Sequence, residues 1–231
     1  ADALATIEAN KVIRIAVPQD FAPFGSVGAD MQPKGYDVDM AKLIADKLGV
    51  KLELVPVTSA NRIPYLQTNK VDLVISSLGR NAEREKVIDF STAYAPFFSG
   101  VFGPGEIAVK EAKDLSGKTV GVTRGAMEDL ELTKIAPADV TIKRYEDNNG
   151  TISAFLSGQV DLIATGNVVA AAILARNPPK KPDIKFLIKN SPCYIGLNKN
   201  EPALLAKVDA IIGAAKKDGA LDAISQKWLG A

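Results

Sequence analysis

Residues 58–91, TSANRIPYLQTNKVDLVISSLGRNAEREKVIDFS, contain the pattern that decides how this chain is interpreted. The apolar run at 71–76 is rich in β-branched residues, which is typical of a buried strand. It leads into the serines Ser76 and Ser77, and Asn81 is then a good N-cap for a short helix in which Arg84 is the third residue. The segment therefore predicts a strand, a turn and a short helix.

Arg84 would lie beside the end of that strand, near backbone N–H groups and the positive end of the short helix. A guanidinium group holds a carboxylate through two parallel hydrogen bonds, each contributing about 1.5–3 kcal/mol. The alternative is a surface ion pair between Arg84 and Glu83, Glu85 or Asp89. The first interpretation predicts a binding protein for a small carboxylate-bearing solute rather than an enzyme.

Composition limits the other classes of function. The 231 residues are 47% hydrophobic, enough for one large domain or two small ones. The 28 basic and 27 acidic residues are well mixed, so we expect no nucleic-acid partner. There is neither a run long enough to span a membrane nor a signal peptide. The N-terminus would suit a mature exported protein whose signal peptide has been removed.

The chain has no histidine and a single cysteine, Cys193. These absences exclude a Ser-His-Asp triad, a Cys-His dyad, an intrachain disulfide and a zinc site with histidine or several cysteine ligands. We therefore expect no catalytic residues, no metal and no cofactor. Cys193 is predicted to be a small buried apolar residue; the alternative is a reactive thiol, which would have no histidine to activate it.

Strands and helices alternate along the chain. Strands are predicted at 12–17, 52–57, 71–76, 118–123, 140–145 and 160–165. Helices are predicted at 62–67, 127–134, 152–156 and 167–175, in the C-terminal tail from Pro202 to Trp228, and at 37–48, with Asp37 as N-cap and Gly49 as its end. This alternation predicts an α/β fold of open, mostly parallel sheets covered by helices.

Two segments echo each other. Residues 63–77, IPYLQTNKVDLVISS, and residues 152–166, ISAFLSGQVDLIATG, share a short helix, a turn and a V-D-L strand at an offset of 89 residues. The echo predicts two lobes that each form an α/β unit. Ligands bind beyond the carboxyl ends of strands in open α/β sheets, here residues 76–79 and 165–167. Two such ends facing each other would form a cleft.

Two extended segments, residues 95–103 and 190–197, are candidates for the connections between lobes. They predict lobe 1 at 1–98 plus 194–231 and lobe 2 at 99–193. A hinge of two crossing strands would allow closure around a ligand. The alternative is a single doubly wound domain.

Four motifs resemble one family over essentially the whole length. They are GYDVDMAKLIADKLG at 35–49, VDLVISSLGRNAEREKVIDFS at 71–91, DLSGKTVGVTRG at 114–125 and ALDAISQKWLG at 220–230. With these motifs the chain resembles family-3 periplasmic solute-binding proteins, the amino-acid-binding components of ABC importers. The resemblance implies a two-lobed type II periplasmic-binding-protein fold and a monomer that is periplasmic, or extracellular and lipid-anchored. It also implies an amino acid or carboxylate ligand, and the importer's membrane subunits as partners.

The resemblance assigns Arg84 to the α-carboxylate of the ligand. Ser77 and Gly79 match positions that add a backbone or hydroxyl contact, although the usual hydroxyl is lost at Gly79. Ser76, at the same strand end, is expected to line the site. Arg62 lies in TSANRIPYLQ, a segment similar to that of glutamate/aspartate-binding members, where the matching arginine holds a side-chain carboxylate; the alternative is an exposed arginine.

Arg80 and Arg124 are further candidates in predicted cleft loops, and four arginines near one cleft favour an anionic group over a cationic side chain.

Aromatic residues should form an apolar wall. Phe21 follows the first strand, where the family places a ligand-stacking aromatic, and Phe24 is a second candidate or a core residue. Tyr36 and Tyr94 are expected to be structural. Asp20 would meet a ligand amine or cap its loop.

The second lobe departs from the family pattern. The aspartate that normally follows the equivalent strand, and holds the α-amino group, is absent: Thr165 is followed by Gly166 and Asn167. Thr165 and Gly166 are still expected to line the site. Asp161 lies earlier, within the strand, and is predicted to be structural.

The loop at 123–127, TRGAM, replaces the usual S-G-T, so that Ala126 stands where a threonine hydroxyl is expected. Gly125 and the amides after it are predicted to bind an anion at a helix N-terminus. A buried ammonium group without a carboxylate partner is costly. Either Asp20 or Glu128 takes that role, or the ligand is an ω-amino acid or an organic acid.

An enzyme is the competing class. Some relatives of this fold are cyclohexadienyl dehydratases, in which a carboxyl group acts as general acid, and Glu128 is the obvious acid here. The alternative role for Glu128 is stabilisation of the first helical turn. A receptor's ligand-sensing domain and an engineered or reconstructed sequence also fit the pattern.

Overall fold

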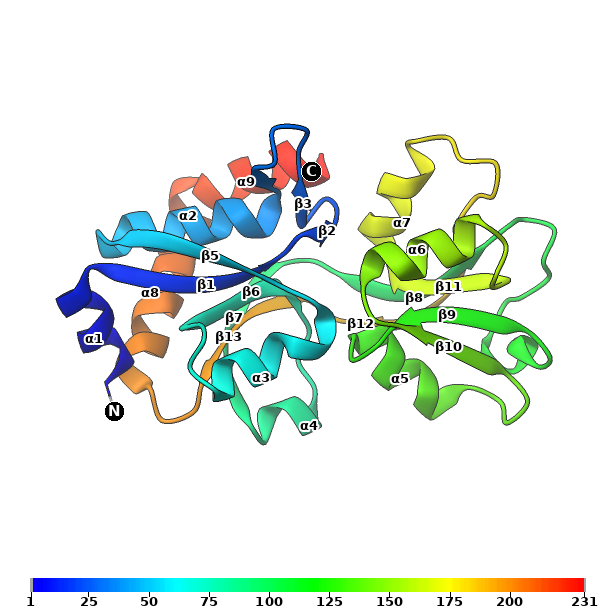
Figure 1. Cartoon of the computed structure of the whole chain (residues 1–231), viewed down its shortest axis with the longest axis horizontal. Coiled ribbons are helices and arrows are strands. Elements are labelled where there is room, and N and C mark those ends of the chain that lie inside the picture. Colours follow the sequence, from blue (N-terminus) through cyan, green and yellow to red (C-terminus); the bar gives the residue numbers. More distant parts are fainter. Residues whose placement is uncertain (1, 231) are drawn as a thin grey trace. The chain divides into compact units, whose positions relative to one another are not determined.

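The computed structural model describes residues 2–230, which divide into two compact units (Figure 1). Unit 1 comprises residues 2–57, 61–96 and 192–230, and unit 2 comprises residues 58–60 and 97–191. The chain therefore passes between the units at 96–97 and 191–192, in addition to the short excursion at 58–60. No helix within residues 2–230 is both long and apolar enough to cross a membrane.

The sheet of unit 1 contains five strands in the order β5 (Lys51–Val57), β1 (Val12–Pro18), β6 (Leu73–Leu78), β13 (Cys193–Asn198) and β7 (Ile88–Ala95). β1 pairs in parallel with β5 and β6, whereas β13 is antiparallel to β6 and β7. A small antiparallel sheet, not predicted from the sequence, is formed by β2 (Asp20–Phe21), β3 (Gly25–Val27) and β4 (Pro33–Lys34).

Helices lie on both faces of the unit 1 sheet (Figure 1). The helices of residues 2–96 and 192–230 are α1 (Ala3–Asn10), α2 (Tyr36–Leu48), η1 (Ser59–Asn61), α3 (Arg62–Gln67), α4 (Ala82–Glu85), α8 (Pro202–Asp218) and α9 (Ala220–Leu229). The C-terminal helix α9 is tied to α2 because Trp228 Nε1 donates to Asp39 Oδ2 over 2.7 Å.

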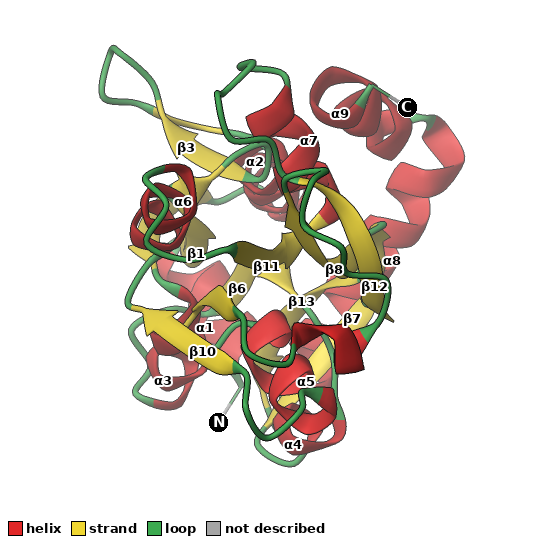
Figure 2. Cartoon of the chain, turned by 90° about the vertical axis from the view of Figure 1, so that its right-hand side faces the viewer, coloured by secondary structure: helices red, strands yellow, loops and turns green. Residues whose placement is uncertain are grey.

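The sheet of unit 2 has the order β10 (Thr141–Tyr145), β9 (Thr119–Thr123), β11 (Leu162–Gly166), β8 (Phe98–Gly103) and β12 (Asp183–Asn190). β9 is parallel to β10 and β11, and β8 is antiparallel to β11. Its helices are η2 (Ala112–Leu115), α5 (Met127–Ile135), α6 (Asn148–Leu156) and α7 (Asn167–Leu174); α5 and α6 cover opposite faces of the sheet (Figures 1 and 2).

The sequence echo has the same structural role in both units. In unit 1 Arg14 N–H donates to Asp72 Oδ2 over 2.8 Å, and Asp72 N–H donates to the Arg14 carbonyl over 2.8 Å. In unit 2 Thr119 N–H donates to Asp161 Oδ2 over 3.0 Å, and Asp161 N–H donates to the Thr119 carbonyl over 3.1 Å. Each V-D-L aspartate therefore ties the start of its strand to the neighbouring parallel strand, which confirms that Asp161 is structural.

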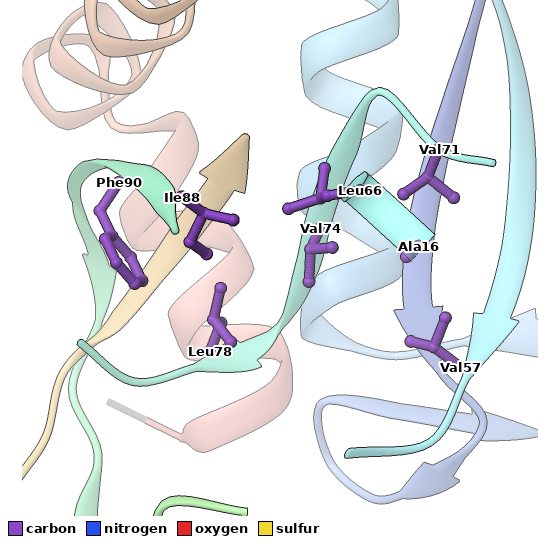
Figure 3. Packing of buried hydrophobic residues seen from close by; sticks show 8 residues of the cluster. All are labelled: Ala16, Val57, Leu66, Val71, Val74, Leu78, Ile88 and Phe90. Atoms are coloured by element: carbon purple, nitrogen blue, oxygen red, sulfur yellow. The ribbon is translucent and has the colours of Figure 1, made fainter. Parts of the chain in front are cut away.

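A hydrophobic cluster in unit 1 joins α3 to the sheet (Figure 3). Its buried members come from β1, β5, β6, β7, α3 and the turn before β6: Ala16, Val57, Leu66, Val71, Val74, Leu78, Ile88 and Phe90. Full burial of a large aliphatic side chain contributes about 1.5–3 kcal/mol. The cluster therefore fixes β6, whose carboxyl end carries the predicted site residues.

The predicted α/β alternation is confirmed, but the sheets are not mostly parallel, because each five-stranded sheet has two parallel and two antiparallel pairings. The strand and helix bounds also differ. β6 extends to Leu78, so Ser77 lies inside the strand rather than after it, and β11 ends at Gly166, one residue later than predicted. Asp37 is not the N-cap of α2. That position is held by Gly35, with φ 143° and ψ 178°, and Asp37 lies within the helix, fully buried. Its role is described below.

Gly35 and Gly49 bound α2 and offer a matched test of this geometry. A Cβ at Gly35 would lie 2.3 Å from the Phe24 carbonyl oxygen, whereas a Cβ at Gly49, with φ 68°, meets nothing within 4 Å. We expect Gly35→Ala to lower the free energy of unfolding by at least about 3 kcal/mol and Gly49→Ala to lower it by about 1 kcal/mol. Urea denaturation measures both, and equal losses would contradict the account of Gly35.

Candidate functional site

The carboxyl end of β6 is held by two ionisable side chains that bond to one peptide group. Arg62 Nη1 donates to the Ser76 carbonyl oxygen over 2.8 Å. Ser77 N–H, on the other side of the same peptide bond, donates to Asp37 Oδ2 over 2.8 Å. The bond from the charged Arg62 contributes about 1.5–3 kcal/mol and the bond to the Asp37 carboxyl group at least about 0.5–1.5 kcal/mol, so the plane of the Ser76–Ser77 peptide is fixed.

Ser77 adopts a left-handed conformation with φ 42°. A residue other than glycine is uncommon there, and sparsely populated backbone conformations of this kind cost about 1–3 kcal/mol. Such conformations persist where surrounding contacts enforce them, and they cluster at ligand-binding sites. Here the bonds from Arg62 and to Asp37 enforce the conformation and determine where residues 78 and 79 lie.

Arg84 is buried beside the same strand end, with 5% of its surface exposed. Asn81 Oδ1 accepts the Arg84 N–H over 2.8 Å, which confirms the predicted N-cap. Arg84 Nη1 donates to the Gly79 carbonyl over 2.8 Å. Its burial rules out a surface position. Helix α4 has only four residues, so its dipole adds little to the charge of the guanidinium group.

Asp37 lies behind the strand end and is fully buried. Tyr94 Oη donates to Asp37 Oδ1 over 2.5 Å, and Tyr36 Oη donates to the Tyr94 carbonyl over 2.9 Å. These bonds confirm that Tyr36 and Tyr94 are structural. Burial raises the pKa of Asp37 to about 8, although the bonds from Tyr94 and Ser77 and the charge of Arg62 oppose that rise.

The buried charges of unit 1 favour an anion. Among its described residues the buried charged side chains are Arg62, Arg84 and Asp37. Because burial raises the pKa of Asp37 to about 8, this carboxyl group carries less negative charge near neutral pH than an ordinary aspartate. The two buried guanidinium groups thus outnumber the one buried carboxyl group of this unit's described residues. Carboxylates satisfy buried guanidinium groups well, since both are planar and bond in pairs.

The other two arginine candidates have a different environment. Arg80 pairs with Glu85 and lies over the rings of Phe90 and Tyr194, with 47% of its side chain exposed. Arg124 pairs with Glu146 over 2.9 Å, with 51% of its side chain exposed. Both are therefore solvated ion pairs, unlike buried Arg62 and Arg84.

The aromatic residues after β1 contact each other. The rings of Phe21 and Phe24 stack with centroids 6.1 Å apart, and Phe24 also contacts Tyr36 at 6.0 Å. Phe24 is fully buried, in agreement with its core alternative, and Phe21 is nearly so. Asp20 lies in β2, opposite Ser26. The role of Phe21 in stacking on a ligand remains a prediction.

The loop at the start of α5 in unit 2 uses its amides internally. Gly125 N–H donates to Asp129 Oδ2 over 3.1 Å, and Ala126 N–H donates to the Thr123 carbonyl over 3.1 Å. These two amides thus bond within the loop in this structure, and anion binding by the loop at Gly125 remains a prediction. The rule that helix N-termini bind anions takes no account of nearby side chains. Here the carboxylate of Asp129, one turn further along, accepts the Gly125 N–H.

Gly166 makes room for an aromatic ring. A Cβ at this position would lie 2.2 Å from Cζ of Phe97. Asn167 Oδ1 accepts the Phe98 N–H over 3.0 Å, and Thr165 is buried in β11. At the position where the resemblance would place an aspartate, a side chain would therefore require the ring of Phe97 to move. The ring of Phe97 therefore occupies space that the side chain of such an aspartate would need.

Two buried acids remain in unit 2. Glu128 Oε2 accepts a bond from Ser99 Oγ over 2.6 Å, and Asp129 Oδ1 accepts one from Arg144 Nε over 2.8 Å. Asp129 is thus committed to the fold of the loop. Glu128 is the acid that the sequence offered as an amine partner or a general acid, and it lies at the first turn of α5.

Within residues 2–230 no cluster of three or more histidine, cysteine, aspartate or glutamate side chains has metal-binding geometry. Cys193 is a free thiol and is fully buried, as predicted.

Residues 13–231 match the family described as bacterial extracellular solute-binding proteins, family 3, and the chain belongs to that family. Its fold is the predicted type II periplasmic-binding-protein fold.

A curated relative is the ABC transporter glutamine-binding protein GlnH of Bacillus subtilis (strain 168), 29% identical, with 99% of this chain and 85% of that protein covered. Among solved structures, the solute receptor for L-cysteine of Neisseria gonorrhoeae has a TM-score of 0.92 and 32% identity, covering 98% of this chain and 93% of the receptor. An ancestral amino acid-binding protein, described as a precursor of cyclohexadienyl dehydratase, has a TM-score of 0.90 and 29% identity and covers 98% and 99% of the two chains.

A side chain introduced at Gly166 tests whether the ring of Phe97 occupies this space. We expect Gly166→Ala to lower the free energy of unfolding by about 2–3 kcal/mol, because the new methyl group overlaps Phe97. Gly105→Ala is the matched control in unit 2, since its Cβ meets only Asp183 at 3.9 Å. In a Phe97→Ala background the loss at Gly166 should largely disappear. An undiminished loss there would show that Phe97 is not the obstacle.

Proposed function

We propose that this protein binds a small carboxylate-bearing solute outside the cytoplasm, with a polar or acidic amino acid as the first candidate, and delivers it to an ABC importer. The observation that carries the proposal is the pair of buried guanidinium groups, Arg62 and Arg84, at the carboxyl end of β6. Membership of a family of extracellular solute-binding proteins supports it. In this proposal the protein is periplasmic, or lipid-anchored, and acts as a monomer.

In the proposed mode of binding, Arg84 takes the α-carboxylate of the solute. The Ser77 hydroxyl and the backbone at Gly79 add hydrogen bonds, and Ser76 and Phe21 line the site beside them. Arg84 already donates one bond to the Gly79 carbonyl, which orients its fork before any ligand arrives. Such preorganisation reduces the entropy cost of binding.

Arg62 is proposed to attract a second carboxylate, on the side chain of the solute. Arg62 is buried, and its bond to the Ser76 carbonyl orients the guanidinium group beside the strand end. A second carboxylate on the solute would pair with this charge, so glutamate-like solutes and dicarboxylates are the preferred anionic candidates.

Unit 2 is proposed to close over the bound solute through Arg124, the loop at Gly125 and Ala126, and the strand end at Thr165 and Gly166. Because Phe97 fills the space next to Gly166, a ligand ammonium group needs another acid, and Glu128 is the candidate in unit 2. An ω-amino acid or an organic acid is the alternative solute. Closure is favoured only by a greater affinity of the solute for the closed state.

The second candidate function is a cyclohexadienyl-dehydratase-like enzyme with Glu128 as general acid. The buried position of Glu128 and the likeness to the ancestral precursor favour it. We propose that the protein is not an enzyme. Incubation with prephenate or arogenate should give no aromatic product, and measurable turnover that Glu128→Gln abolishes would overturn this assignment.

Arg84→Ala tests the proposed site directly. A thermal-shift screen of amino acids, ω-amino acids and dicarboxylates first identifies the strongest binder. The substitution should then weaken that binder by at least about 100-fold in calorimetry, because two charge-assisted hydrogen bonds are lost.

Arg80→Ala is the matched control for this substitution, since Arg80 has the same charge and lies close in sequence but pairs with Glu85 at the surface. It should change the affinity by less than about threefold, as surface ion pairs contribute little. Retained affinity in the Arg84 variant would reject the assignment.

Arg62→Ala tests the second carboxylate. If Arg62 holds a side-chain carboxylate, the loss of affinity should be about tenfold greater for L-glutamate than for L-glutamine, since the lost bond is charge-assisted for only one of them. Calorimetry with both amino acids measures the ratio. An equal loss for the two would assign Arg62 to the Ser76 carbonyl alone.

A further inference from the structure

We propose that Asp37 is a positioning residue for carboxylate binding: by holding the Ser77 N–H it fixes the turn that carries Gly79 and Arg84. The inference rests on the proposed function, and it assigns a role to a residue that does not touch the solute. Asp37 was expected to cap α2, yet the structure places its carboxyl group against β6.

The first step is the grip on the peptide group between Ser76 and Ser77. Its carbonyl accepts from Arg62 and its N–H donates to Asp37, both over 2.8 Å. Rotation of this peptide plane would break both bonds at once. The left-handed conformation of Ser77, with φ 42°, is thereby maintained against its intrinsic cost.

The second step is transmission to Arg84. The turn at Ser77 sets the direction of residues 78 and 79, and the Gly79 carbonyl accepts from Arg84 Nη1 over 2.8 Å. A rotated Ser77 would move that carbonyl and release the guanidinium fork from its orientation. Binding geometry tolerates little displacement, because a group about 1 Å out of place forfeits much of its contribution.

The third step is the fixation of Asp37 itself. Tyr94 Oη donates to its Oδ1 over 2.5 Å, and Tyr94 is held in turn by Tyr36. The carboxyl group is fully buried and so acts on the solute only through the strand end.

Ionisation of Asp37 should oppose anion binding. Burial raises its pKa to about 8, so the group gains a negative charge as the pH rises through that value. The charge would partly neutralise Arg62 beside the site. The titratable and charged groups that act on Asp37, or on the tyrosines that hold it, are Arg62 of α3, Tyr94 of β7, Tyr36 of α2, Cys193 of β13 and Asp222 of α9.

The test compares Asp37→Asn with Asp37→Ala in calorimetry with L-glutamine and glutarate between pH 6.5 and 9.5. Asparagine keeps an oxygen that accepts from Ser77 but cannot ionise. We expect wild-type affinity to fall about 3- to 10-fold over this range, from the added charge. At pH 7 the affinity of Asp37→Asn should lie within about threefold of the wild-type affinity. As the pH rises, this variant should not show the decrease in affinity that ionisation of Asp37 causes. Asp37→Ala should lose at least about 30-fold, as Ser77 N–H is left without its acceptor.

Asp39→Ala is the matched control, because it removes a carboxylate from the same helix that bonds Trp228 rather than β6. It should leave affinity and pH profile unchanged. Titration of a probe's own groups affects all variants alike. If Asp37→Ala does not fold, Tyr94→Phe replaces it in the test. The hydrogen bond from Tyr94 lowers the pKa of Asp37, so its loss should move the midpoint of the affinity–pH profile to higher pH.

Wild-type affinity in both Asp37 variants, or an unchanged pH profile in Asp37→Asn, would overturn the inference. Failure of the wild type to bind either probe at pH 7 would instead count against the proposed function. In that case amide hydrogen exchange at Ser77 decides: it should be slow in the wild type and in Asp37→Asn and at least about 100-fold faster in Asp37→Ala. Equal rates would reject the role of Asp37.

Discussion

A guanidinium group can be kept from water only if its N–H groups find acceptors, and unit 1 buries two of them beside the end of one strand. Backbone carbonyls of that strand and its turn supply part of the need: Ser76 accepts from Arg62 and Gly79 accepts from Arg84. The backbone must therefore present its oxygens in fixed directions. The left-handed Ser77, the carboxyl group of Asp37 and the tyrosines behind it all serve that requirement.

This requirement also connects the fold to the proposed function. The cluster around Leu66 and Val74 anchors β6, and the V-D-L aspartate Asp72 ties the start of that strand to β1. The amino end of β6 is thus held by the fold, and its carboxyl end carries the strained backbone of Ser77 and the charges of Arg62 and Arg84. Unit 2 has the same strand order and the same aspartate contact at Asp161, but its strand end carries Phe97 beside Gly166 where a carboxylate would be expected. The half proposed to bind the carboxylate is thus more complete than the half proposed to bind the amine.

Sequence patterns correctly predicted the features that depend on residues close together in the chain. The N-cap at Asn81, the burial of Cys193 and the paired V-D-L strands follow from spacing and residue type, and the structure confirms them. Asp37 was misassigned because an acid at a helix start usually caps it, and nothing local shows that Ser77, forty residues further on, takes its carboxyl group. Two further contacts, between Phe97 and Gly166 and between Asp129 and Gly125, were not predicted because no local pattern in the sequence indicates them. The G-Y-D-V-D motif, with an acid among residues that proved buried, was the available signal for Asp37.

A crystal structure with the strongest binder from the thermal-shift screen tests the central claim most directly. We predict a carboxylate of that solute in two hydrogen bonds with the guanidinium group of Arg84, beside Ser77 and Gly79 and with the Ser77 N–H still on Asp37. A solute whose carboxylate lies elsewhere, with Arg84 making no contact to it, would contradict the account.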